Sequence, residues 1–526
     1  YDTIGTFRVS VSASGWAKIG GSYTVSSTET ALLLYAQLVG ATSAQSFYID
    51  DVVIKLTTPP PLPVQTDIPQ IYQVFADYFP VGAEIDTSDI TGEHAQLLTT
   101  HFNSIVSGND MKWSSVENVQ GTFNYSNADA EVAFAKANNL KVRGHNLIWS
   151  TGSQTPSWVF LEADGKTALS ASNPADVALL TQRIQTHIQQ EVQHFGSAVY
   201  VWDVINEPFD NSQADCLQHG PFYQILGKSY LDIALTAARQ YTPPGTELFI
   251  NDYNTTIPAK LACVVQVLQD LKSRGIPIDG IGHEAHNSIN FPAAGDFVTA
   301  VNTLAADFPG IHQQITELDV SVYGGSDNTS DYGTNPGFVP PAILAEQAWL
   351  YEQSFAAFRQ LKGKLEAVTF WGFADDNTWL STFPIARLNE PLPFDAQLQA
   401  KSAYWGMVDP TQLPGYGLRF NISKTGAQNA RVWTVTATNP SSGTAYTTQI
   451  GGLTLTQVAG AACTPVITPP STYPVVLGDI ASGGTASASF TINFTGCSNL
   501  ARFALRMPWS SAVYETGTFA LGNQFR

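Results

Sequence analysis

Strand-like and helical segments alternate eight times between residues 71 and 410, and this alternation constrains the fold more than any other feature of the chain. The strand-like runs are FPVGAEI, FNSIVSG, LKVRGHNLI, VYVWDVIN, ELFINDY, GIGHEAH, HQQITELD and AVTFWGFA. Helical patterns lie between them, as in GKSYLDIALTAARQ, where apolar residues recur at helical spacing (Leu231, Ala234, Leu235, Ala238). Eight such units predict an α/β fold, the (β/α)8 TIM barrel, whose chemistry lies at the C-terminal ends of its strands.

The segments on either side of the barrel region have a different composition. Residues 1–57 alternate apolar and polar side chains in short runs, which is typical of strands, and residues 58–70 form a proline-rich stiff linker. Residues 411–526 are rich in Thr, Ser, Val and Gly and predict an immunoglobulin-like β-sandwich of about seven strands. We expect its Trp433 and Trp509 to be core residues rather than a sugar-stacking platform, and the domain to be a spacer or an attachment module.

The charge of the chain limits its partners. It carries 25 basic against 44 acidic side chains, a net charge of −19, which argues against nucleic acid and is compatible with a neutral polymer. Residues 411–526 hold six basic and two acidic groups, so the acidic excess belongs to residues 1–410. No apolar run reaches the roughly 18 residues that a membrane helix needs, so we expect no membrane partner.

Four cysteines allow two disulfides. Cys463 and Cys497 lie in the C-terminal region, and Cys216 and Cys263 lie in the barrel region; either pair bridges only in an oxidising compartment. Cys263 is read equally well as a small buried apolar residue. No CxxC or Cys/His spacing typical of a metal site occurs.

Two glutamates at the ends of strand-like runs carry the candidate chemistry. Glu207 lies in VWDVINEP and Glu317 in QQITELDV. Glycosidic bond cleavage needs such a pair, since one carboxyl protonates the leaving oxygen while the other attacks or stabilises the anomeric carbon. The alternative for each residue alone is a structural ion pair.

Eight segments give a specific family resemblance over residues 71–410: SGNDMKW, FNYSNADAEVAFAKANNLKVRGHNLIW, WDVINEP, NDYN, GIGHEAH, ITELD, FWGFADDNTW and KSAYWGMVD. In order and spacing they resemble family 10 of the glycoside hydrolases, which are mostly retaining endo-β-1,4-xylanases. The resemblance implies a barrel that cleaves xylan or xylo-oligosaccharides without a cofactor or a metal, and we expect a secreted or cell-surface monomer. Residues 1–57 also resemble the second half of a jelly-roll carbohydrate-binding module, through GSYTV, LLLYAQL and FYIDDVVI.

The resemblance assigns roles around the two carboxyls. It makes Glu207 the general acid/base and Glu317 the nucleophile. Asn206 is expected to bind the 2-hydroxyl of the reacting sugar, although an Asn at this place could instead satisfy a buried strand end. His286 and Asp319 resemble the pair that keeps the nucleophile ionised. The run HEAH could suggest a metal site, but neighbouring residues of one strand cannot all face inward.

Further residues match those that hold the sugar in this family. Asn109, Lys112, His145 and Trp149 correspond to side chains on the non-reducing side of the cleaved bond, and Trp371 and Trp379 correspond to the tryptophans that cover it. Aromatic faces stack on pyranose rings while charged and amide groups bind the hydroxyls. Each tryptophan alone is more often a core residue, and it is their grouping that favours a sugar-binding cleft.

The chain departs from the family pattern at three positions. Gly108 replaces the Glu that would hold the sugar two places from the cleaved bond, which predicts a subsite that is weaker by about 1.5–3 kcal/mol or is shaped for a bulkier group. Ser150 stands where the family has a second histidine, in a loop two residues longer, and Gln154 could replace the family's glutamine. Glu284 replaces a Gln beside the acid/base, so we expect it to bind substrate and to titrate with the two catalytic carboxyls.

Three functions stay open on the sequence. The first is a retaining β-1,4-xylanase. The second keeps the mechanism but acts on another β-glycoside or on short or decorated oligosaccharides, because of the altered subsites. The third is a barrel that binds polysaccharide without cleaving it, against which the intact Glu207 and Glu317 argue.

Overall fold

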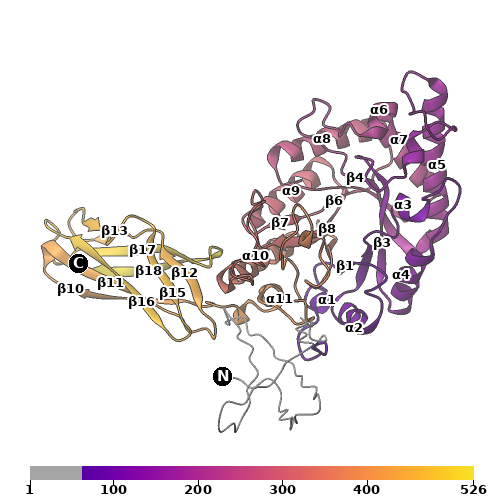
Figure 1. Ribbon diagram of the computed structural model, residues 1–526. Coiled ribbons are helices and arrows are strands. Elements are labelled where there is room, and N and C mark those ends of the chain that lie inside the picture. The colour runs from indigo at the N-terminus through magenta and orange to yellow at the C-terminus, as the bar shows by residue number, and fades with distance from the viewer. Residues whose placement is uncertain (1–61) are drawn as a thin grey trace, which may run out of the picture. The chain divides into compact units, whose positions relative to one another are not determined.

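The computed structural model describes residues 62–526, so the expected carbohydrate-binding-module-like segment at 1–57 lies outside the described residues. Parallel strands near each of the eight predicted runs form a closed barrel, shown in Figure 1 with helices on its outside. The barrel strands are β1 (Val81–Ile85), β2 (Ser104–Ser107), β3 (Lys141–Trp149), β4 (Val199–Asn206), β5 (Glu247–Asp252), β6 (Gly280–His283), β8 (His312–Ser321) and β9 (Ala367–Phe370).

The barrel closes because each strand pairs with two neighbours. β1 pairs with β2 and with β9, and β6 pairs with β8, where Gly280 lies opposite His312. The short strand β7 (His286–Ser288) continues the line of β6 and pairs with the outer part of β8. Strands such as β9, with the sequence AVTF, are buried along their whole length, as expected for parallel strands covered on both faces.

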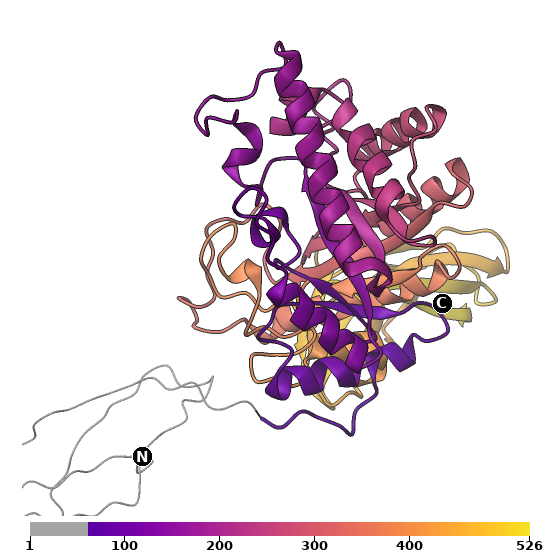
Figure 2. The same cartoon turned by 90° about the vertical axis from the view of Figure 1, so that its right-hand side faces the viewer.

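Helices connect the barrel strands. They are α1 (Ile71–Val74), α2 (Gly92–His101), α3 (Trp113–Val116), α4 (Ser126–Ala137), α5 (Pro174–Phe195), α6 (Pro221–Leu226), α7 (Ser229–Tyr241), α8 (Pro258–Ser273), α9 (Ala294–Asp307), α10 (Pro341–Gln360) and α11 (Ser402–Val408). The longest is α5, which faces the viewer in Figure 2. Its start follows from the sequence, since the Asn173 side chain accepts a hydrogen bond from the amide of Ala175 and Pro174 occupies the first turn.

Two antiparallel sheets follow the barrel, with nine strands where about seven were expected. One sheet has the order β10 (Arg419–Thr425), β11 (Arg431–Thr438), β16 (Thr485–Asn493), β14 (Val466–Thr468). The other has the order β13 (Thr454–Ala459), β17 (Arg502–Ser511), β12 (Ala445–Ile450), β15 (Val475–Ile480), with β18 (Glu515–Phe525) paired to β17.

The two sheets share one hydrophobic core. Trp433 and Phe490 from the first sheet and Phe503 and Met507 from the second are all fully buried in it. Trp433 is therefore a core residue, as expected. Trp509 is half-buried and packs against Phe420, with 5.2 Å between the ring centroids, so neither tryptophan forms an exposed flat platform.

Both cysteine pairs form disulfides. Cys216 bridges to Cys263 with 5.1 Å between the Cα atoms, and Cys463 bridges to Cys497 with 5.3 Å. Cys263 is thus both buried and disulfide-bonded, so the two interpretations of this residue, a disulfide partner and a small buried residue, both hold. The first bridge attaches the loop that follows β4 to helix α8. Among residues 62–526, none of the helices combines the length and the apolar character needed to cross a bilayer.

The Cys216–Cys263 bridge closes a loop of 47 residues, for which chain entropy gives a stabilisation of about 4 kcal/mol. We expect the variant Cys216→Ser/Cys263→Ser to lower the free energy of unfolding of the barrel by up to that amount, measured by urea unfolding followed by tryptophan fluorescence. The matched control is Cys463→Ser/Cys497→Ser, whose effect belongs to the C-terminal sheets. Equal barrel stability with and without the first bridge would contradict this prediction.

Candidate active site

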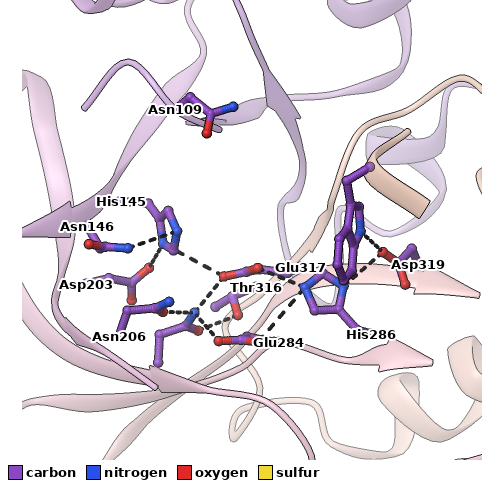
Figure 3. Close-up of polar contacts among 12 residues, drawn as sticks. Asn109, His145, Asn146, Asp203, Asn206, Glu284, His286, Thr316, Glu317 and Asp319 are labelled. Atoms are coloured by element: carbon purple, nitrogen blue, oxygen red, sulfur yellow. Dashed lines mark hydrogen bonds and ion pairs between the residues drawn. The ribbon is translucent and has the colours of Figure 1, made fainter. Parts of the chain in front are cut away.

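The predicted site residues lie at the C-terminal ends of the barrel strands. Asn206 ends β4 and Glu207 follows it, Trp149 ends β3, and Trp371 follows β9. Glu317 lies in the outer half of β8, beyond the residues that pair with β6. Figure 3 shows the side chains from these strands turned toward one another. This is the end of the barrel at which TIM-barrel sites are built.

Glu207 has a left-handed backbone conformation, with a φ of +52°. Such a conformation is unusual for a residue with a Cβ and is found mostly where the surroundings impose it. The Glu207 amide donates to the carbonyl of Asn251 at 2.8 Å, and the Ser150 hydroxyl donates to the carbonyl of Glu207. Burial raises the pKa of the Glu207 carboxyl and the negative charge of Glu317 adds to this, against the lowering effect of the nearby Trp149 indole N–H.

The pKa of Glu317 is displaced in the opposite direction. Burial alone would raise the pKa of its carboxyl, but the nearby His145 and the hydrogen bond from His286 outweigh burial and lower it. Nε2 of His286 lies 3.0 Å from Oε2 of Glu317, and Nδ1 of His145 lies 3.8 Å from Oε1. Two carboxyls in one site thus have pKa values displaced in opposite directions, an arrangement that separates an acid from an ionised group.

His286 forms an ion pair with a carboxylate on each side. Its Nδ1 lies 2.8 Å from Oδ2 of Asp319, and its Nε2 contacts Glu317. Although burial works against the charged form, Asp319 and Glu317 raise the pKa of His286 to about 10. The indole Nε1–H of Trp379 also donates to Oδ2 of Asp319 at 2.9 Å. Figure 3 shows His286 between Glu317 and Asp319.

Asn251 connects the two halves of the site, and its role was missed on the sequence although its motif NDYN was noted. Its Nδ2 lies 2.9 Å from Oδ1 of Asn206, 3.2 Å from Oε1 of Glu284 and 2.6 Å from Oε1 of Glu317. Its Oδ1 accepts from the hydroxyl of Thr316 at 2.6 Å. The position of Asn251 at the end of a predicted strand was the available signal.

A buried ion pair that the sequence analysis did not predict supports His145. Arg143 and Asp203, both fully buried, pair with each other inside the barrel. Asp203 Oδ2 also lies 2.9 Å from Nδ1 of His145, which orients the imidazole. Only the alternation of strand residues could have suggested that Arg143 points inward.

Lys112 lies close to the tryptophans Trp149 and Trp371. Nζ of Lys112 is 5.0 Å from the ring centroid of Trp149 and 5.7 Å from that of Trp371. Trp371 also meets His145 edge to face, with 5.2 Å between centroids, and Trp379 packs against His286 at 4.8 Å. The aromatic rings and the charged groups thus line the same site, as a sugar-binding cleft requires.

Asn109 and Gln154 lie on the β2 side of the site. Oδ1 of Asn109 accepts from Nζ of Lys112 at 3.3 Å and from Nε2 of Gln154 at 3.1 Å. Gln154 therefore reaches the site from the lengthened loop after β3. Ser150 does not replace an imidazole there, since its hydroxyl is bonded to the carbonyl of Glu207.

Glu284 is buried near the carboxyls of the two candidate catalytic residues. Burial, followed by the charges of Glu317, Glu207 and Asp252, raises its pKa well above the usual value. The HEAH run is not one regular strand, because Ala285, with a φ of +62°, separates β6 from β7. His283 points away and bonds Thr255 at 2.7 Å, whereas Glu284 and His286 both face Glu317.

Glu284, His286 and Glu317 could be taken for a metal site, because one ligand atom of each lies within 4.8 Å of the others. Metal ligation requires a neutral imidazole with a free nitrogen. Both nitrogens of His286 face carboxylates, and its pKa of about 10 keeps the ring charged. The geometry therefore fits a charged His286 ring that pairs with the carboxylates, and not a metal ion bound by them.

Asp252 and Lys260 fix the loop that follows Glu207. Nζ of Lys260 lies 2.5 Å from Oδ1 of Asp252, and Oδ2 accepts from the amide of Phe209 at 2.7 Å. Despite this cation, burial raises the pKa of Asp252 to about 7.

The raised pKa of Glu284 predicts how stability depends on pH. The folded chain keeps the Glu284 proton above pH 4.5, where the unfolded chain loses it, so this residue makes stability fall as pH rises. Glu284→Gln removes that loss, and we expect its free energy of unfolding relative to the wild type to increase by up to about 1.4 kcal/mol per pH unit. Urea unfolding at several values between pH 5 and 8 measures this. The exposed Asp307→Asn is the control, and a pH-independent difference for Glu284→Gln would contradict the prediction.

Comparisons with known proteins agree with this architecture. The thermostable celloxylanase of Thermoclostridium stercorarium is 36% identical over 351 residues, covering 66% of this chain and 89% of that protein. Exoglucanase XynX of Acetivibrio thermocellus is 36% identical over 429 residues, covering 78% of this chain, which spans only 36% of the length of that relative.

Solved structures match the same region. The crystal structure of xylanase B from Clostridium stercorarium is 36% identical, with a TM-score of 0.62, and covers 65% of this chain and 100% of that one. An intracellular xylanase of Thermoanaerobacterium saccharolyticum, solved as a mutant in complex with xylotetraose, is 37% identical with a TM-score of 0.58 and covers 66% of this chain and 100% of that one. Residues 70–410 match the glycosyl hydrolase family 10 sequence pattern, and the chain belongs to this family.

Proposed function

We propose that the chain is a retaining endo-1,4-β-xylanase. The observation that carries this function is the opposite displacement of the pKa values of Glu207 and Glu317 at one end of the barrel. Membership of the family and the xylanase relatives named above support xylan as the substrate over other β-glycosides.

The reaction proceeds by double displacement. Glu207, whose pKa burial raises, gives its proton to the oxygen of the leaving sugar, while Glu317, whose pKa is lowered, attacks the anomeric carbon as a carboxylate. Water then attacks the glycosyl-enzyme, and Glu207 accepts the proton from that water. The product keeps the configuration of the substrate because the carbon is inverted twice.

The surrounding residues hold this chemistry in place. His286, paired with Asp319, keeps Glu317 ionised until it attacks. Oδ1 of Asn206 is bonded to Asn251, and within residues 62–526 no acceptor takes its Nδ2, which leaves that amide to donate to the 2-hydroxyl of the reacting sugar. Lys112 and Trp149 bind the same sugar, and Trp371 and Trp379 cover it.

The remaining assignments extend this proposal. The chain works as a secreted or cell-surface monomer, for which the two disulfides are the support. The C-terminal sheets form an immunoglobulin-like spacer or attachment module, and residues 1–57 are part of a carbohydrate-binding module.

Substitution of each glutamate tests its role in the reaction. We expect Glu317→Ala to abolish hydrolysis of xylan, xylotriose and xylobiose, measured by product analysis. Glu207→Ala should lower kcat/KM on xylan by about 10²–10⁴-fold, with a smaller effect on an aryl β-xyloside whose leaving group needs no proton. Proton NMR of the wild type should show the β-anomer as the first product. Equal activity of Glu317→Ala and the wild type would refute the nucleophile assignment.

Glu284 should influence the pH range of the enzyme. The charge of Glu207 is one cause of the raised pKa of Glu284, so whichever of the two carboxyls loses its proton first hinders the other, and in Glu284→Gln the acid/base group titrates without this partner. We therefore expect the basic limb of the kcat/KM profile on xylan to move to lower pH in that variant. Identical profiles for the two proteins would rule this coupling out.

A further inference from the structure

Gly108, at the end of β2, is a glycine because of the space around it. Its φ is not in the left-handed region, so the backbone does not require glycine. A Cβ at this position would lie 1.7 Å from Oε1 and 2.7 Å from the carboxyl carbon of Glu84. The Glu84 carboxyl therefore occupies the volume into which a side chain at 108 would extend.

Glu84 comes from the neighbouring strand β1, on which it is the only residue that is not buried. Its Oε2 lies on the β9 side, where a Cβ on Gly372 would be 3.8 Å away. Besides burial, the charges that act on its pKa are those of Asp89, Lys112, Asp86 and Glu317, so the carboxyl lies within electrostatic reach of Lys112 and Glu317 in the site described above. Strands β1, β2 and β9 thus form one wall of the site, and the missing side chain at Gly108 leaves room for Glu84.

The carboxyl of Glu84 has its hydrogen-bonding capacity free. Within residues 62–526 no side chain or backbone amide donates a hydrogen bond to it. A largely buried carboxyl without a partner is costly unless water or a ligand satisfies it. Burial raises its pKa to about 8, so that near neutral pH it can donate one hydrogen bond and accept another, as a sugar hydroxyl requires.

We propose that Glu84 binds the sugar two places from the cleaved bond and supplies from β1 the carboxyl that Gly108 lacks at the end of β2. This proposal rests on the xylanase function proposed above. It reverses the expectation from the sequence that this subsite is weakened, since the carboxyl has moved from one strand to the next. Glu84 and Gly108 then form a reciprocal pair, each of which requires the other.

Two substrates with the same aryl leaving group isolate this subsite. An aryl β-xyloside places one sugar on the non-reducing side of the cleaved bond, and an aryl β-xylobioside places two. We expect Glu84→Ala to lower the ratio of kcat/KM for the xylobioside to that for the xyloside by about 10–100-fold, the effect of one strong hydrogen bond. Glu84→Gln, which keeps a donor and an acceptor, should retain more of the ratio.

Moving the carboxyl from position 84 to position 108 provides a sharper test. Gly108→Glu alone should lose activity, since two side chains would share one space. Glu84→Ala/Gly108→Glu should recover the wild-type ratio to within several-fold, whereas Glu84→Ala/Gly108→Ala, which has no carboxyl, should not. Glu346→Ala, a glutamate on α10 whose pKa burial raises to about 7, controls for loss of a partly buried carboxyl elsewhere.

The outcomes separate the two proposals. An active wild type whose ratio is the same in Glu84→Ala would overturn the role of Glu84 and leave the xylanase function intact. Equal loss on both substrates would also overturn it, because the residue would then act on the fold or on the reacting sugar. A wild type inactive on xylan and on both aryl substrates would overturn the proposed function and this inference with it.

Discussion

The charge on His286 is the interaction on which the site depends. Five carboxyls, those of Glu84, Glu207, Asp252, Glu284 and Glu317, gather at one end of the barrel with Lys112, Lys260 and His286 among them. Burial opposes ionisation of every one of these acids. The pKa of Glu317 is nevertheless lowered, because the imidazolium of His286, which Asp319 holds in place, is hydrogen-bonded to it. Burial is the largest cause of the raised pKa of each remaining carboxyl, and the charge of Glu317 adds to it at Glu84, Glu207 and Glu284.

The position of Glu207 depends on backbone contacts rather than on charge. Its left-handed conformation is maintained by Asn251 on one side and by Ser150 on the other. The loop beyond it is held by the Asp252 contact to the amide of Phe209 and by the Cys216–Cys263 bridge. Ser150, which differs from the histidine of the family pattern, therefore has a structural role. Its hydroxyl bonds to the backbone of Glu207, where the resemblance led us to expect an imidazole.

The strands of the barrel could be predicted from the sequence, whereas the contacts between side chains of different strands could not. Each barrel strand is a short apolar run with flanking turn residues, a local signal. Glu207, Glu317 and the tryptophans were predictable because their motifs end those strands. Asn251 was harder to assign, since its role depends on three residues from other strands. The inward ion pair of Arg143 with Asp203 and the Glu84 carboxyl beside Gly108 depend on packing between strands, which a linear pattern does not contain.

The packing of Glu84 against Gly108 has a consequence for how such a barrel can change by mutation. A return of the carboxyl to β2 through single substitutions must pass through a protein with two acidic side chains in one volume or through one with neither. Given the proposed role of Glu84, both intermediates lose part of this subsite, so we expect the two positions to change together. A substitution at either position that is neutral in a relative need not be neutral here.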